Sequence, residues 1–164
     1  MGVLIASSDF SSIIATDVYT VNEIDGAIDT YELQLIYEML GVELAELFLD
    51  DLSGGVPVSA RFTEIFESWF KTINEEVVQS LGMKQMLVWW VFFFYVREQW
   101  QDNSIQGNVE NQGSINTDSR MSYATLQKNY NQAIKTYKAI QAYIEENLTT
   151  YPEYKGMSKE YIGI

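Results

Sequence analysis

Cysteine and histidine are both absent from this chain of 164 residues. Without cysteine, disulfide frameworks, thiolate nucleophiles and thiolate-bound zinc are excluded. Without histidine, the chain lacks the usual general base, the usual metal ligand and the one side chain that titrates unperturbed near neutral pH. We therefore expect no enzymatic activity, no catalytic residues, no cofactor and no metal centre.

Carboxylates alone still leave one enzymatic alternative, a hydrolase with a paired acid and base of the glycosidase kind. The adjacent pairs Glu75–Glu76 and Glu145–Glu146 are the visible candidates. Neighbours in a helix diverge by about 100°, however, and do not converge on one substrate. The sequence therefore disfavours this alternative.

Positive charge is scarce and unevenly placed. The chain has 10 Lys and Arg against 23 Asp and Glu, a formal net charge of −13. All eleven acids from Asp9 to Asp51 precede the first basic residue, Arg61. Tight nucleic-acid binding is disfavoured, because it needs clustered cations. The acids predict a solvated surface, a mimic of nucleic-acid charge, a dock for a basic partner, or the wall of a channel through which a polyanion slides.

No apolar run is long enough to span a membrane. The longest, residues 86–96, falls short of the roughly 20 apolar residues that a span requires. The beginning of the sequence has neither the positive charge nor the apolar run of a secretory signal. We therefore expect no membrane partner. The hydrophobic content of 47% excludes a wholly disordered chain and, at this length, predicts one domain.

Residues 83–100, MKQMLVWWVFFFYVREQW, are the most apolar and aromatic stretch. They predict a central helix that is hydrophobic on every side and must be surrounded. A strand is the alternative, but eleven apolar residues exceed a usual strand and the flanks favour a helix. We assign to the core Trp89, Trp90 and Phe93, together with Trp69. Part of the cover of this helix could come from a neighbouring subunit, because so small a chain has few elements to wrap it.

Residues 29–51 carry a second helical pattern, interrupted by one glycine. Apolar side chains recur every three or four residues and mark one helix face: Leu33, Ile36, Leu40, Leu44 and Leu47. The acids between them are expected on the solvent side: Glu32, Glu43, Glu46 and Asp50. Gly41 predicts a kink or two shorter helices.

A third helix is predicted for residues 59–73, after a break at residues 52–58, and Ser59 is its expected cap. Its aromatic stripe is typical of a core face rather than a ligand site: Phe62, Ile65, Phe66, Trp69, Phe70 and Ile73. Residues 74–82 are then expected to connect this helix to the central one.

After the central helix, residues 101–117 are rich in Asn, Gln, Gly and Ser and predict a long polar loop that becomes ordered on a partner. Residues 118–148 predict a last long helix. Residues 149–164 predict an extended arm whose tyrosines a neighbour covers. The fold class expected from these patterns is all-α: a small helical bundle in a single domain over residues 1–148, followed by the arm.

The acidic N-terminal third and the last helix are complementary in charge. Lys128, Lys135 and Lys138 cluster opposite the apolar stripe of that helix. Between copies of the chain, such complementarity would set a head-to-tail register that closes into a ring if the rotation allows. We therefore predict an interface that contains these lysines and the tyrosines of the arm: Tyr151, Tyr154 and Tyr161.

Five segments, in this order, carry a resemblance to a known class of proteins: TYELQLIYEMLG (30–41), RFTEIFESWF (61–70), LGMKQMLVWWVFFFYVREQW (81–100), GNVENQGSINTDS (107–119) and NYNQAIKTYKAIQAYIEENLTTYPEYKG (129–156). The chain resembles small helical virion proteins of tailed bacteriophages, namely the head–tail connector or neck adaptor proteins of crAss-like and related phages. The resemblance covers most of the chain and includes no active-site motif.

This resemblance implies a virion protein that is made in the host cytoplasm and lies in the neck. Its copies would form a homo-oligomeric ring below the portal protein, about twelve by family resemblance. The ring would extend the DNA channel, let DNA pass without specific binding, and dock further tail proteins. The alternative that we retain is an acidic DNA mimic that inhibits a basic nucleic-acid-binding protein.

Overall fold

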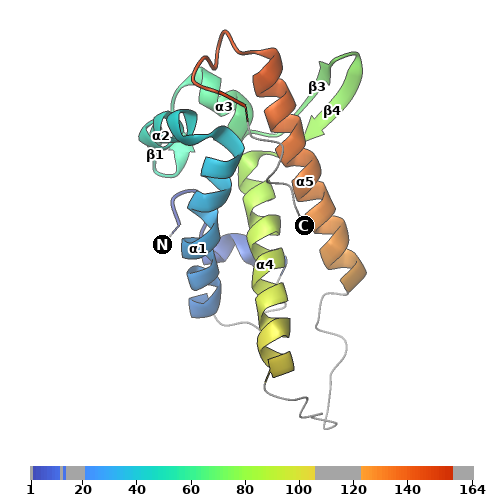
Figure 1. Cartoon of the computed structure of the whole chain (residues 1–164). Coiled ribbons are helices and arrows are strands. Elements are labelled where there is room, and N and C mark those ends of the chain that lie inside the picture. Colours follow the sequence, from blue (N-terminus) through green and yellow to red (C-terminus); the bar gives the residue numbers. More distant parts are fainter. Residues whose placement is uncertain (1, 12, 14–20, 106–122, 157–164) are drawn as a thin grey trace.

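The computed structural model describes residues 2–11, 13, 21–105 and 123–156. Three long helices lie side by side: α1 (Val21–Leu40), α4 (Met83–Ile105) and α5 (Tyr123–Glu146), with α4 in the middle (Figure 1). The expected central helix is therefore confirmed. It continues to residue 105, so residues 101–105 of the expected polar loop are helical, and residues 106–117 of that loop lie outside the described residues.

The all-α expectation is wrong. Strand β1 (Leu52–Ser53) pairs antiparallel with β2 (Val56–Pro57), and β3 (Trp69–Ile73) pairs antiparallel with β4 (Glu76–Ser80). The fold is mixed, with helices and two small two-stranded sheets. The first hairpin turns at Gly54 and Gly55, whose φ angles of 60° and 80° are open to glycine at little cost.

The second hairpin replaces the end of the third predicted helix. Helix α3 (Ala60–Phe66) stops seven residues before the predicted end at residue 73, and residues 74–82 contain a strand rather than only a connection. The chain reverses at Asn74 and Glu75, with φ angles of 49° and 68°, as the tightest hairpin turns require. Trp69 and Ile73 are four residues apart, a spacing that fits one face of a helix and equally one face of a strand.

Gly41 divides the first helical pattern as expected. Helix α1 ends at Leu40, Gly41 has φ 75°, and α2 (Val42–Asp50) follows. The helix begins at Val21, however, earlier than predicted. Its buried stripe is also shifted, because Leu33 is exposed while neighbouring positions are buried: Ile28, Leu35, Ile36 and Met39.

Glu32 corrects the expected division between acids and core. The sequence pattern predicts Glu32 on the solvent side of the helix, but this residue is only 1% exposed. Its carboxylate accepts hydrogen bonds from the backbone N–H groups of Val3 (2.6 Å), Leu4 (2.7 Å) and Ile5 (2.8 Å). A Cβ at Gly2 would lie 2.2 Å from the Ile5 carbonyl oxygen, so only glycine fits there. Glu32 thus fixes the N-terminal segment on α1.

The segment after α5 is not an extended arm over the residues that the structure describes. Tyr151 is fully buried and donates a hydrogen bond to the Arg61 carbonyl oxygen at 2.6 Å, and Tyr154 is also buried. These two tyrosines belong to the core of their own chain, so residues 149–156 contradict the prediction. Residues 157–164, with Tyr161, lie outside the described residues, as do residues 118–122 of the predicted helix.

One hydrophobic core joins these elements. Its fully buried aromatic side chains are Phe10, Phe48, Phe62, Phe92 and Tyr151. The predicted core residues Trp69, Trp89, Trp90 and Phe93 pack against this cluster but are only partly buried. The sequence therefore identified the central helix correctly, and the incomplete cover on one side agrees with the expectation that so small a chain has few elements to wrap it.

Candidate interaction surfaces

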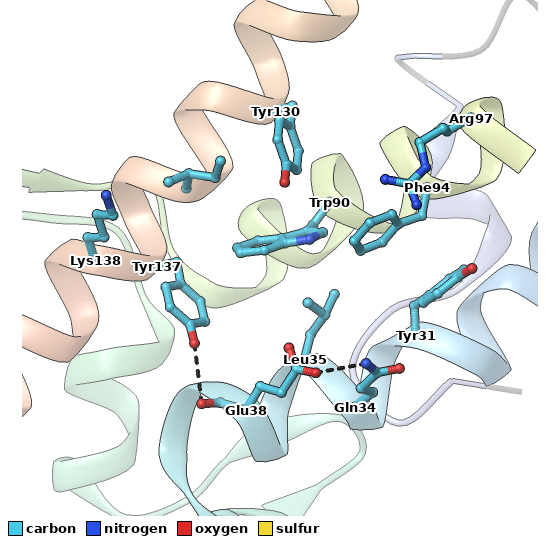
Figure 2. A pocket seen from close by; sticks show the side chains of 11 residues that line it. Tyr31, Gln34, Leu35, Glu38, Trp90, Phe94, Arg97, Tyr130, Tyr137 and Lys138 are labelled. Carbon is cyan, nitrogen blue, oxygen red and sulfur yellow. Dashed lines mark hydrogen bonds between the residues drawn. The ribbon is translucent and has the colours of Figure 1, made fainter. Parts of the chain in front are cut away.

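A groove opens between α1, α4 and α5, where the central helix is incompletely covered. It encloses about 520 Å³, and Figure 2 shows its walls. Aromatic rings come from all three helices: Tyr31, Trp90, Phe94, Tyr130 and Tyr137. Because residues 86–96 of α4 are apolar on every side, any sector that their neighbours leave open exposes large rings, and this groove is such a sector.

Two polar atoms in the groove walls have no hydrogen-bond partner among the described residues. They are the indole Nε1 of Trp90 and the hydroxyl of Tyr130, and both are buried. Leaving a buried donor unpaired costs about 1–3 kcal/mol. Tyr137, by contrast, donates to the Glu38 carbonyl oxygen at 3.2 Å. The walls of the groove therefore contain two covered hydrogen-bond donors that no described residue satisfies.

Burial keeps the groove tyrosines protonated. It raises the pKa of Tyr130, and together with the nearby Glu38 carboxylate it raises the pKa of Tyr137 to about 12. The pKa of Tyr31 is also raised to about 12, first by burial and then by its hydrogen bond to Glu98. Tyrosine hydroxyls are neutral at pH 7 in any case, and the raised pKa values keep these three protonated well into the alkaline range.

The rim of the groove carries both charges, in different states of pairing. Glu38 accepts a hydrogen bond from Gln34 Nε2 at 2.7 Å, and Glu98 accepts one from Tyr31. Arg97 lies over the Phe94 ring, 5.6 Å from its centroid, and neither Arg97 nor Lys138 forms a salt bridge with a described residue. The two cations are thus available to an incoming carboxylate.

The β3–β4 hairpin presents an apolar outer face. Its register pairs Phe70 with Gln79 and Thr72 with Val77, so these four side chains share one face. Phe70 is 70% exposed and Val77 is 78% exposed. The opposite face packs toward α5, where the Trp69 ring lies 5.5 Å from that of Tyr143. Figure 1 shows the hairpin projecting beside α5.

The three predicted lysines of α5 are exposed. Lys135 and Lys138 also line a second cavity, of about 460 Å³, together with Val77 and Gln79 of β4. Lys138 lines both cavities, so the basic face of α5 runs between the groove and the hairpin. Its role in an interface stays a prediction.

Several of the N-terminal acids have structural partners. Asp9 forms a salt bridge with Lys84 at 2.9 Å, and Glu43 pairs with Lys155. Asp51 accepts the backbone N–H of Ser59 (2.8 Å) and of Val58 (2.9 Å), and these bonds, that to Ser59 foremost, hold its pKa below the usual range. With Glu32 buried, part of the acidic third stabilises the fold instead of covering the surface.

The expected absence of catalytic and metal-binding groups stays an expectation. Within residues 2–11, 13, 21–105 and 123–156, no cluster of three or more acids is placed to hold a metal ion. The candidate pairs Glu75–Glu76 and Glu145–Glu146 are exposed. No helix in the same ranges has the length and hydropathy needed to cross a membrane.

Comparison with known proteins adds no relative. No protein-family model, curated protein or solved structure matches the chain. The surfaces themselves therefore carry the argument about function. The uncovered groove had a signal in the sequence, the apolar run of residues 86–96. The exposed hairpin was missed, because residues 69–73 fit a helical pattern and residues 74–82 were predicted to be a connection.

Proposed function

We propose that this chain is a structural, non-enzymatic subunit of a bacteriophage virion. Copies of it assemble into a ring between portal and tail, extend the DNA channel and dock further tail proteins. One observation carries the proposal: a single chain leaves two apolar surfaces open, the groove beside α4 and the hairpin face with Phe70 and Val77. Contiguous exposed apolar surface of this kind is typical of proteins that bind other proteins.

The positions of the two surfaces favour a ring over a simple dimer. They lie on different faces of α5: Tyr130, Ile134 and Tyr137 line the groove, whereas Ala139 and Ala142 lie beside the hairpin. When two different surfaces of one protein meet, the contact is heterologous, and repetition of it closes into a ring or continues as a filament. The sequence resemblance to neck adaptors supports the ring.

The charge distribution supports a DNA conduit. Cations on a channel wall would release counterions and hold phosphates, whereas carboxylates leave the duplex hydrated and free to slide. Asp29, Glu46 and Asp50 are exposed on α1 and α2, and the chain carries a net charge of −13. The exposed lysines of α5 then serve contacts between subunits.

Imaging of particles made without this protein tests the proposal. We expect filled heads that fail to acquire tails or that leak DNA, and recovery of tailed particles when the wild-type protein is supplied in trans. Normally tailed, infectious particles would overturn the proposal. Tight binding of the free protein to a host nuclease or polymerase would instead favour the DNA-mimic alternative, which the structural engagement of Asp9, Glu32 and Asp51 weakens.

A further inference from the structure

We propose that the β3–β4 hairpin of one copy docks in the groove between α1, α4 and α5 of the next copy. Phe70 enters the aromatic cavity, and the acidic turn of the hairpin meets Arg97 and Lys138. This inference rests on the proposed self-assembly and specifies which surfaces meet. The partner is therefore a second copy of this chain, bound through a heterologous contact.

The shape and polarity of the hairpin face match the groove. The groove is lined by aromatic rings and is large enough to admit a side chain of the size of phenylalanine. Phe70 and Val77 provide apolar surface, and the side-chain oxygens of Thr72 and Gln79 on the same face can accept hydrogen bonds.

The charges of the two surfaces are also complementary. Glu75 and Glu76 at the turn are exposed and lie at the end of the hairpin. The only cation in the hairpin, Lys71, lies on the inner face, with Nζ 3.7 Å from the centre of the Tyr143 ring. The turn therefore presents two acids with no cation of the hairpin on its outer side, while the groove rim presents Arg97 and Lys138 without ion pairs to described residues.

The hairpin cannot fill the groove of its own chain. Its inner face packs against α5 through Trp69 and Lys71, and it joins α4 directly through Leu81 and Gly82. Gly82 has φ 90°, and a Cβ there would lie 3.0 Å from the Phe66 carbonyl oxygen, so the connection is tightly packed. The hairpin is therefore held beside α5 and cannot reach the groove of its own chain, while Phe70 remains 70% exposed and accessible to another copy.

Cross-linking in trans tests the contact directly, because the chain has no cysteine of its own. Thr72→Cys places a thiol on the hairpin face and Gln34→Cys places one in the groove, both at exposed positions. When the two full-length variants are mixed and oxidised, we expect a disulfide-linked heterodimer. Val58→Cys, at a site 71% exposed outside both surfaces, is the matched control. If Thr72→Cys links to Gln34→Cys no better than the control does, the docking is wrong.

A charge exchange tests the electrostatic part. Glu75→Lys with Glu76→Lys should weaken self-association at least about tenfold, as should Arg97→Glu with Lys138→Glu. Mixing the two double variants should restore association, because opposite charges again face each other. Glu46→Lys with Asp50→Lys changes the net charge equally on α2 and should leave association unchanged. Equal weakening by this control pair would overturn the specific contact.

Sedimentation equilibrium with Phe70→Ser separates the failure of this inference from that of the proposed function. Phe70 is exposed, so the variant should melt as the wild type does, and its association should weaken at least about tenfold. Wild-type assembly that Phe70→Ser leaves unchanged would overturn the docking and leave the ring intact. The docking would also be overturned if the wild type stayed monomeric at every concentration, or if native mass spectrometry found a small apolar ligand in the groove. The proposed function, by contrast, would be overturned by normally tailed particles made without the protein.

Discussion

At the scale of single residues, Glu32 is the least expected feature of the molecule. A buried carboxylate is usually matched by a cation, yet here three consecutive backbone N–H groups satisfy it. Glu32→Gln should lower the free energy of unfolding by about 1.5–3 kcal/mol. The charge-assisted hydrogen bonds are lost, and the amide NH₂ of Gln, itself a donor, faces a backbone N–H that needs an acceptor. Urea denaturation measures this loss. Glu46→Gln, at an exposed position of α2, is the control and should change stability by less than about 0.5 kcal/mol.

Buried tyrosines predict a loss of stability in alkali. The pKa of Tyr31, Tyr137 and Tyr143 is raised from the ordinary value of 10.0 to about 12, chiefly by burial. Below pH 10 both folded and unfolded chains keep these protons. Between pH 10 and 12 the unfolded chain releases protons that the folded chain retains, so stability falls as pH rises through that window.

The melting temperature between pH 9 and 12 measures this loss. Tyr137→Phe removes one titrating group and should make the decline shallower than in the wild type. Tyr37→Phe, on α1 and outside the groove, is a matched tyrosine control. A melting temperature that is constant from pH 10 to pH 12 would contradict the prediction.

At the scale of elements, α4 has one side inside the core and another side that its neighbours cover only in part. Phe92 is 1% exposed, whereas its neighbour Phe93 is partly exposed and stacks on Tyr130 with ring centroids 3.9 Å apart. Phe92→Ala should therefore cost about 3–5 kcal/mol of unfolding free energy. Phe93→Ala should cost about 1–3 kcal/mol. Thermal or chemical denaturation of the two variants compares them, and equal losses would mean that α4 is enclosed on both sides.

How far the sequence predicted each element depended on how local its cause is. The central helix and the break at Gly41 follow from an apolar run and from one glycine, and both were confirmed. The hairpin was missed because Trp69 and Ile73 fit a helical and a strand spacing alike. The residues that separate the two possibilities are Asn74 and Glu75, whose positive φ angles a sequence does not display.

Features that depend on distant partners were not predictable from the sequence. Glu32 can be buried because its carboxylate oxygens accept hydrogen bonds from backbone N–H groups that lie 27 to 29 residues earlier in the chain. Tyr151 can be buried because its hydroxyl donates a hydrogen bond to the carbonyl oxygen of Arg61, 90 residues earlier. Nothing in the composition around either residue indicates these partners. For the groove, the sequence indicated only that residues 86–96 need apolar neighbours on every side, and not where those neighbours are missing.

At the scale of the whole molecule, the basic face of α5 predicts partly electrostatic assembly. Reversing its exposed lysines, Lys128, Lys135 and Lys138, to Glu should weaken self-association and leave the melting temperature of the monomer unchanged, because none of them forms a salt bridge with a described residue. Neutral Gln at the same three positions should give an intermediate effect. Sedimentation velocity at low and high salt compares the wild type with the Glu and Gln variants. Salt screens the charge contribution to association, whereas the apolar contribution is not screened. Assembly unaffected by the triple Glu variant would exclude this face from the interface.

The bond between the Tyr151 hydroxyl and the Arg61 carbonyl oxygen also bears on how the protein is made. Tyr137 and Glu38, 99 residues apart, are joined in the same way. A chain emerging from the ribosome can form its early helices, but it cannot complete its core until these late tyrosines have been synthesised. Until then the sites around Arg61 and Glu38 lack their partners, and a chain that stops short of Tyr151 leaves that part of the core open. Because these contacts join residues 90 to 99 positions apart, only a chain that already includes Tyr151 can complete this part of its surface. Any assembly that uses the surface would then select completed chains.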